Sequence, residues 1–307
     1  MNELKESLFR KMLLIRKTEQ AIDALFSMGL LRGTVHGCIG QESIAVGLLS
    51  HLDPKVDYIT GNHRSHGHYL ALCGEPEGLL GELMGKRIGA VEGRGGSQHI
   101  RYKNFFTNGI TGGMVPIAVG LAFAQKKRGH GGIVVAFFGD GAMNEGYVME
   151  AFNLASVLQL PILFALENNG FAMSTDQKTT TAGNFESRIK AFGIEYHFDQ
   201  ATNAIETYQK CGQLVEQVRR KGTPLFAEFQ THRFSGHSKS DPREYISEEL
   251  DAYWRTNDPL ERLGKEIDPG KKSQIELEVE KRIEDAKIRS MQSPFPNPEN
   301  EYEGEEK

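Results

Sequence analysis

Two polar residues that suit a metal ion each follow an apolar run of strand length. Asp140 comes after the run 132–138, and Asn169 comes after the run 161–166. Mg²⁺ prefers oxygen ligands in a near-octahedral shell, with few from protein and the rest from phosphate and water. The glycines beside Asp140 would let the backbone approach a diphosphate. Asp140 alone could be an ordinary helix N-cap, but its pairing with Asn169 favours a magnesium and diphosphate site.

The stretch between the two apolar runs predicts how these residues come together. Residues 143–159 have a helical pattern, so the segment is expected to form a strand, a helix and a second strand. The right-handed crossover of such a unit leaves its strands parallel. Asp140 and Asn169 therefore meet at the carboxyl edge of a sheet, where open α/β proteins bind ligands. The other expected elements are helices at 3–28, 41–52, 114–128, 185–192, 204–221 and 248–291, a loop-rich region at 57–113, and a third strand at 224–229.

Three histidines and an arginine are clustered within residues 62–68, namely His63, Arg64, His66 and His68. A zinc site would need three or four converging ligands, but no acidic partner lies nearby in the sequence and no HExxH pattern occurs. An anion site fits better, because Arg64 offers a bidentate fork and His63 or His66 adds donors. A structural role remains open for any single histidine, but the cluster favours anion binding.

A second polar segment, residues 231–242, follows the third expected strand and contains His237. It could be a solvated surface loop that leads into the next helix. Because it starts at the sheet edge that carries Asp140 and Asn169, we expect a loop that covers the site.

The composition excludes several classes of protein. The net charge of −5 and the pI near 6.1 argue against nucleic acid as the main partner, and the absence of a GxxxxGK[ST] pattern argues against an ordinary nucleotide triphosphatase. Three widely separated cysteines suggest reduced thiols. With neither a signal peptide nor a membrane-length apolar run, we expect a cytoplasmic protein without membrane contact. Residues 1–293 should form one domain with an N-terminal helix, and residues 294–307 an acidic, disordered or partner-facing tail.

Several motifs, taken in order along the chain, resemble one family. They are Gly40-Gln41-Glu42, His63-Arg64-Ser65-His66-Gly67, Gly95-Gly96-Ser97, Asn108-Gly109-Ile110, Gly139-Asp140-Gly141, Asn168-Asn169, Gly236-His237-Ser238 and Asp241-Pro242. From about residue 8 to residue 298 the chain is similar to the alpha subunit of the thiamine-diphosphate-dependent first component of 2-oxo acid dehydrogenase complexes, of the pyruvate or acetoin dehydrogenase type. The resemblance implies an α/β fold with three αβα layers and a mostly parallel sheet, and it implies thiamine diphosphate and Mg²⁺ as cofactors.

The resemblance also implies a role for each matching residue. The implied metal ligands are Asp140, Asn169 and the backbone carbonyl of Phe171. The implied diphosphate contacts are Arg64, His63, where many relatives carry Tyr, and the backbone donors of Gly141 and Ala142. Gly109 and Thr111, the latter in place of a common Val, match main-chain contacts to the aminopyrimidine. His237 would contact cofactor and substrate, His36 matches a substrate-side position, and His237, His66 and His36 are the candidate catalytic residues.

Thiamine diphosphate chemistry also needs a carboxyl group at a pyrimidine ring nitrogen. In the family this glutamate comes from a second, pyrimidine-binding domain, for which 307 residues are expected to leave no room. The expected assembly is therefore two alpha chains with two beta chains that carry this domain. The expected reaction is oxidative decarboxylation of a 2-oxo acid, with pyruvate as the leading substrate, and acyl transfer to a lipoyl group on an acyltransferase. Acetoin cleavage, a split transketolase-type carboligase and a non-catalytic scaffold subunit remain alternatives.

Overall fold

The longest apolar runs of the sequence form the middle of one seven-stranded sheet. A computed structural model describes residues 2–31 and 33–297 and gives the strand order β2-β3-β1-β4-β5-β9-β8. Neighbouring strands are parallel except for β2 and β3. The strands are β1 (Tyr58–Gly61), β2 (Arg101–Tyr102), β3 (Phe105–Thr107), β4 (Val134–Gly139), β5 (Ile162–Asn168), β8 (Glu195–Asp199) and β9 (Leu225–Gln230), and β6 (Phe171–Ala172) and β7 (Thr175–Asp176) form a separate antiparallel pair.

The central strands are buried on both faces. Along β4, Val134, Ala136 and Phe138 pack into one hydrophobic core, whereas Val135 and Phe137 pack into another. Successive side chains of a strand point to opposite faces, so a strand covered on both sides is continuously apolar. The expected α/β fold with a mostly parallel sheet between helical layers is confirmed.

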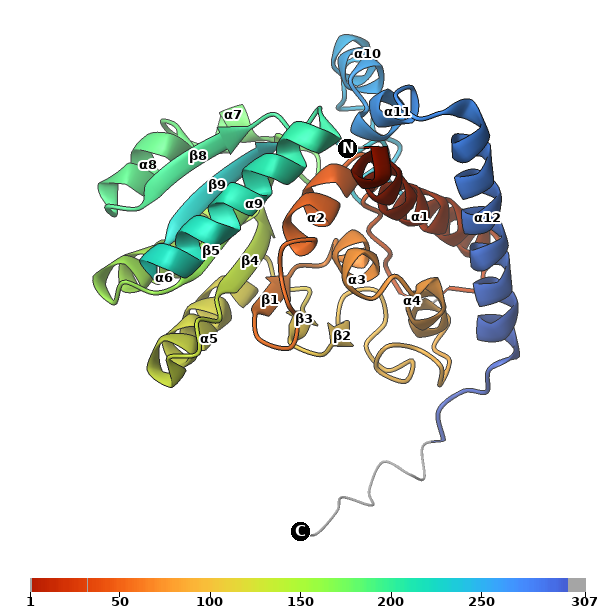
Figure 1. Ribbon diagram of the computed structural model, residues 1–307, viewed down its shortest axis with the longest axis horizontal. Coiled ribbons are helices and arrows are strands. Elements are labelled where there is room, and N and C mark those ends of the chain that lie inside the picture. The colour runs from red at the N-terminus through yellow and green to blue at the C-terminus, as the bar shows by residue number, and fades with distance from the viewer. Residues whose placement is uncertain (1, 32, 298–307) are drawn as a thin grey trace.

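Helices cover both faces of this sheet (Figure 1). One face is covered by α5 (Met114–Arg128), α6 (Gly146–Val157) and α8 (Phe185–Ala191). The other is covered by α1 (Asn2–Ser27), α2 (Glu42–Leu49), α3 (His66–Cys73), α4 (Pro76–Leu83), α9 (Ala204–Lys221), α11 (Pro259–Gly264) and α12 (Pro269–Gln292). The short α7 (Gln177–Thr180) and α10 (Glu248–Thr256) complete the helices of the described residues.

Capping residues explain why two of the expected helices end where the sequence predicts. The side chain of Asn203 accepts hydrogen bonds from the first turn of α9, and Gly222 ends that helix with a left-handed φ of 65°. Gly129 ends α5 in the same way, with a φ of 70°. The predicted ranges 114–128 and 204–221 are confirmed.

Several elements differ from the prediction. The expected helix at 143–159 is preceded by a 3-10 helix, η1 (Asp140–Asn144), and the extended backbone of Glu145 separates η1 from α6. Strand β8 was not predicted, because it lies at the edge of the sheet and its partly exposed Glu-Tyr-His-Phe-Asp sequence forms no apolar run. The loop-rich region at 57–113 also contributes β2 and β3 to the other edge.

The first residues of the predicted tail contact the domain. The backbone N–H of Arg87 donates to the carbonyl of Pro294 over 2.9 Å, and Lys86 lies over the ring of Phe295. The rest of the predicted tail, residues 298–307, lies outside the described residues. Within the part of the chain that the structure describes, no helix is both long and apolar enough to cross a bilayer, and the cysteines are free thiols.

Candidate active site

A cavity of about 380 Å³ lies where the chain leaves the carboxyl ends of β1, β4 and β5. It brings together every candidate residue of the sequence analysis except His66 and His68 of the histidine cluster. These lining residues are His36, His63, Arg64, Gly109, Thr111, Asp140, Gly141, Ala142, Asn169, Phe171 and His237. They come from segments far apart in the chain, so the cavity is a product of the tertiary fold.

Asp140 and Asn169 follow the adjacent strands β4 and β5, as the strand–helix–strand prediction requires. The Asp140 side chain is buried, and this burial raises its pKa to about 6 despite hydrogen bonds from the backbone and the charge of Arg233. A buried carboxylate is costly unless a cation or donors compensate it. Together with the amide of Asn169 and the nearby backbone of Phe171, Asp140 forms an oxygen-rich donor set that fits Mg²⁺.

The cavity glycines are constrained by packing. A Cβ atom at Gly141 would lie 2.9 Å from the Cβ of Ala172, and one at Gly109 would lie 2.1 Å from Oε1 of Gln98. The sequence interpretation assigned Gly141 to the close approach of a diphosphate, whereas in the structure a neighbouring side chain occupies the space beside it. Gly141 and Ala142 both lie in η1 and line the cavity.

Three imidazole rings meet on another wall of the cavity. The ring centroids of His36 are 4.7 Å from His63 and 4.9 Å from His237, and those of His63 and His237 are 5.6 Å apart. Burial, followed by the charge of Arg64, lowers the pKa of His36 to about 3, of His63 to about 2 and of His237 to about 4. All three rings are therefore neutral near pH 7.

The charge of Arg64 determines which kind of ligand the wall of three histidines favours. Its buried guanidinium donates to the carbonyl oxygens of Gly37 (2.5 Å) and His237 (3.0 Å) and lies 3.3 Å from Nδ1 of His237. Burial and the charge of Arg233 lower the pKa of Arg64 to about 10. Three histidines with ligand atoms within 4.8 Å could hold a transition metal, but the adjacent guanidinium opposes a cation and favours an anion.

His66 lies behind the cavity wall. It is fully buried, with Nδ1 2.8 Å from Oε1 of Glu19 and Nε2 2.9 Å from Oγ of Ser97. Glu19 also accepts hydrogen bonds from the backbone and the thiol of Cys38. The structure therefore does not bring His66 to the cavity with the other candidates, and its contacts are those of a residue that positions the segment carrying His36.

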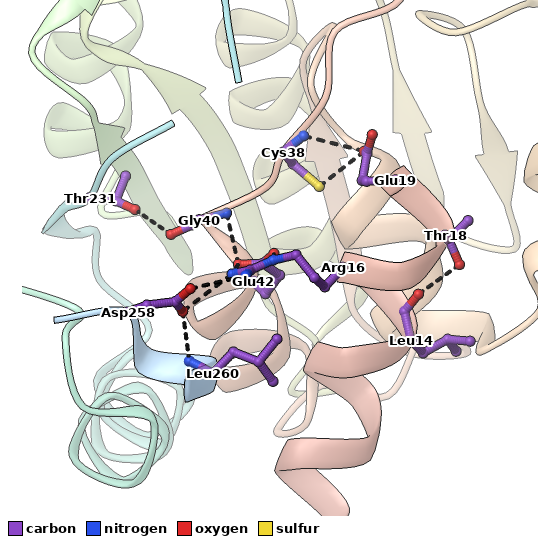
Figure 2. A network of polar contacts seen from close by, with 10 residues as sticks. All are labelled: Leu14, Arg16, Thr18, Glu19, Cys38, Gly40, Glu42, Thr231, Asp258 and Leu260. Carbon is purple, nitrogen blue, oxygen red and sulfur yellow. Dashed lines mark hydrogen bonds and ion pairs between the residues drawn. The ribbon is translucent and has the colours of Figure 1, made fainter. Parts of the chain in front are cut away.

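A buried ion-pair network supports the same segment (Figure 2). The guanidinium of Arg16 lies between the carboxylates of Glu42 (2.5 Å) and Asp258 (2.9 Å). Glu42 in turn accepts the backbone N–H of Gly40 over 2.9 Å, and the Thr231 hydroxyl donates to the Gly40 carbonyl over 3.2 Å. This network ties the segment before α2 to the start of the loop that carries His237.

The polar lining residues Gln41, Gln98 and Glu167 are among those that were not singled out from the sequence as site residues. Gln41 is buried, and its Oε1 has no hydrogen-bond partner among the described residues. Gln98 places Nε2 3.5 Å from Nδ1 of His36, and Glu167 lies 3.2 Å from Nε2 of His68. A charged residue at the end of an otherwise apolar strand could have pointed to Glu167. Gln98 has no comparable sequence signal.

Comparison with known proteins agrees with this geometry. Residues 10–299 match the family described as dehydrogenase E1 component. A pyruvate dehydrogenase E1 component subunit alpha from Zymomonas mobilis is 36% identical over 96% of this chain and 86% of that protein. Proteins of the same name from Rickettsia bellii and Rhizobium meliloti are 35% and 37% identical over 96% and 90% of this chain, and over 93% and 81% of their own lengths. The chain therefore belongs to the dehydrogenase E1 component family and is a subunit of a thiamine-diphosphate-dependent 2-oxo acid dehydrogenase.

Proposed function

We propose that this chain is the alpha chain of an enzyme that oxidatively decarboxylates pyruvate and transfers the acyl group to a lipoyl group. The observation that carries the proposal is a single cavity with two kinds of wall, one with Asp140, Asn169 and Phe171, whose oxygen atoms suit a magnesium ion, and one with Arg64 and three neutral histidines. The names of the relatives support pyruvate as the substrate. Acetoin cleavage, a carboligase activity and a scaffold role are not favoured.

The residues of the cavity divide the binding of the cofactor among them. Asp140, Asn169 and the carbonyl of Phe171 would hold Mg²⁺, and Arg64 with His63 would bind the diphosphate together with the backbone N–H groups of Gly141 and Ala142. The main chain at Gly109 and Thr111 would contact the aminopyrimidine. When bound, thiamine diphosphate supplies an electron sink for the carbon atom that loses carbon dioxide.

His36 and His237 are the groups that handle substrate and protons. Their rings are adjacent, and without an anion nearby their pKa values are low, about 3 and about 4. A bound diphosphate and a substrate carboxylate would bring negative charge close to both rings and raise these pKa values. This shift moves the two histidines toward the range in which a group can both donate and accept a proton near neutral pH.

The proposed assembly is a heterotetramer of two alpha and two beta chains. The beta chain carries the pyrimidine-binding domain and the glutamate that the aminopyrimidine requires, and a lipoyl-bearing acyltransferase accepts the acyl group. Family membership supports a beta chain and a lipoyl partner in general. The cytoplasmic location expected from the sequence stays a prediction.

Turnover measurements on the purified alpha–beta complex test the proposal. The alpha chain is produced together with its beta chain, and turnover is measured with and without thiamine diphosphate and Mg²⁺. Reduction of an artificial electron acceptor is followed for pyruvate, 2-oxobutyrate, a branched 2-oxo acid and acetoin, and carbon dioxide release is followed for the three 2-oxo acids, because acetoin cleavage releases none. We expect the highest kcat/KM for pyruvate and no turnover without thiamine diphosphate. A higher kcat/KM for acetoin or for the branched acid would overturn the assignment of pyruvate, and the absence of turnover with every substrate would overturn the enzymatic proposal.

A further inference from the structure

The loop that carries His237 is tied to a helix outside the cavity through one carboxylate. Residues 231–246 connect β9 to α10 without regular secondary structure, and α10 lies at one end of the molecule beside α11 (Figure 1). Asp251 of α10 accepts a hydrogen bond from Nη2 of Arg243 over 2.5 Å, and the same oxygen lies 3.2 Å from Nε2 of His232. Asp251 therefore contacts both the beginning and the end of the loop.

From Arg243 the contacts reach His237 in two steps. The backbone N–H of Arg243 donates to one carboxylate oxygen of Asp241 over 2.9 Å. The other oxygen of Asp241 accepts the backbone N–H of His237 and the hydroxyl of Tyr245, each over 2.6 Å. Arg243 has a φ of 66°, an uncommon value for a residue other than glycine. This turn therefore depends on the contacts of its side chains.

The beginning of the loop is held by the same helix. Nη2 of Arg243 also donates to the carbonyl of Arg233 over 3.1 Å. The buried ring of His232 is stacked on Trp254 of α10, with ring centroids 6.0 Å apart and planes 6° apart. Asp251 and Trp254 are three positions apart, so they lie on neighbouring parts of one helix face. That face of α10 therefore contacts the loop at its start, through His232, and at its turn, through Arg243.

We propose that Asp251 is a positioning residue for the reaction in this cavity, acting through Arg243 and Asp241 on His237. The inference rests on the proposed function, because it assigns His237 a part in turnover. Loss of the carboxylate leaves Arg243 without its counter-charge and releases the turn that fixes His237. Asp251 has no contact with the strand ends that carry Asp140 and Asn169, and Arg64, which donates to the carbonyl of His237, is also held by the carbonyl of Gly37. Cofactor binding should therefore persist.

Asp251→Asn tests the proposal in the assembled alpha–beta complex. Because a displacement of about 1 Å can cost roughly 100-fold in rate, we expect kcat to fall about 10- to 100-fold, with thiamine diphosphate affinity within about 3-fold of the parent. Amide hydrogen exchange in residues 231–246 should accelerate at least about 10-fold, since the loop opens locally. Glu249→Gln is the matched control, because this carboxylate lies on the same helix but is exposed; it should leave both readouts unchanged.

A second substitution separates positioning from general destabilisation. If Asp251 acts through His237, adding Asp251→Asn to His237→Ala should lower kcat by less than about 3-fold, because coupled residues are not additive. A further 10- to 100-fold loss would overturn the proposal. Arg243→Gln breaks the same contact from the loop side and should reproduce the effect of Asp251→Asn, which covers the case in which one variant fails to fold.

The exchange measurement distinguishes failure of this inference from failure of the proposed function. It needs no substrate, so parent-like exchange in the loop of Asp251→Asn overturns the positioning role whatever reaction the enzyme catalyses. Conversely, a parent complex that releases no carbon dioxide from any 2-oxo acid overturns the proposed function. In that case faster amide hydrogen exchange in the loop of Asp251→Asn would still confirm that Asp251 holds the loop. Asp251 would then no longer be assigned a role in 2-oxo acid turnover.

Discussion

Two walls of the cavity are built in different ways. One wall is made of strand ends, with Asp140 after β4 and Asn169 after β5, and both strands are buried along nearly their whole length. Another wall is made of segments without regular secondary structure, which carry His36 and His237. The first wall is fixed by backbone ladders within the core, and the second is fixed by hydrogen bonds between side chains and the backbone.

This difference separates binding from turnover. Metal ligands need fixed geometry, and central strands supply it because their positions are set by the whole sheet. Side chains that contact the substrate can change position during the reaction, and loops allow such movement. A substitution of a metal ligand in the strand wall should therefore abolish cofactor binding, whereas a substitution of His36 or His237 in the loop wall should spare cofactor binding and reduce the rate.

The largest expected effect is the loss of cofactor binding in Asp140→Ala. Removal of an anionic ligand leaves Mg²⁺ with an incomplete shell. Since the loss of a residue that only orients a ligand costs about 10- to 100-fold in metal affinity, the loss of the ligand itself should exceed that. Calorimetry with thiamine diphosphate and Mg²⁺ on the assembled complex measures it, with the exposed Glu150→Gln as control. Parent-like affinity would show that Asp140 is not a metal ligand.

His237→Ala should have the opposite signature. We expect turnover, and acyl transfer to lipoyl in particular, to fall by roughly 10²–10⁴-fold, the usual contribution of a positioned acid–base group. Cofactor affinity should stay close to that of the parent, because the strand wall is intact. Steady-state kinetics and calorimetry on the same preparation test both halves. Normal turnover would reduce the loop to a cover over the site.

The strand wall could be predicted from the sequence because its signals are local. The apolar run before Asp140 identifies a buried strand, the next helix and strand follow the same logic, and the crossover rule places Asn169 beside it. Edge strand β8 gave no such signal, because its mixed sequence is half exposed. The spacing between Gly-Asp-Gly and Asn-Asn resembles that of thiamine-diphosphate enzymes, and this resemblance identified the expected ligand.

The loop wall could be predicted only as a set of residue types. No periodicity indicates that His36, His63 and His237 meet, since they come from three distant segments joined by tertiary contacts. For the same reason His66, beside His63 in sequence, could not be recognised as a buried partner of Glu19. The sequence also did not predict the 3-10 helix that begins at Asp140 or the extended residue Glu145 that follows it, because both depend on the packing around the cavity.

In the absence of metal, the buried carboxyl group of Asp140 in the strand wall should lower the free energy of unfolding as the pH rises. Burial raises the folded-state pKa of Asp140 from its usual 3.8 to about 6, so the folded protein holds this proton over a range in which the unfolded chain has lost it. Stability therefore falls as pH rises from about 4 to 6, by at most about 3 kcal/mol. Asp140→Asn should remove this loss, and the metal-free variant should be the more stable protein at pH 7. Urea unfolding of the full-length chain between pH 4 and 7.5 measures the difference, and a constant difference across that range would contradict the assignment.

The loop wall should respond to acid with the opposite sign. Burial and the charge of Arg64 lower the folded-state pKa of His63 from 6.5 to about 2. Below pH 6.5 the unfolded chain therefore binds a proton that the folded protein excludes, and stability falls as pH falls. Between pH 7 and pH 5 this single group should cost up to about 2 kcal/mol.

His63→Gln isolates this contribution, because glutamine keeps a polar side chain that does not titrate. We expect the variant to lose up to about 2 kcal/mol less stability than the parent between pH 7 and pH 5, in urea unfolding of the metal-free chain. His130→Gln, at an exposed histidine outside the cavity, is the matched control and should follow the parent. If His63→Gln also follows the parent, the ring is already protonated or freely hydrated in the folded state, and His63 cannot be part of a dry anion-binding wall. If the loss of stability toward acid is smaller in His63→Gln, and the loss of stability from pH 4 to pH 6 is smaller in Asp140→Asn, these two opposing contributions are assigned to the two walls of the cavity.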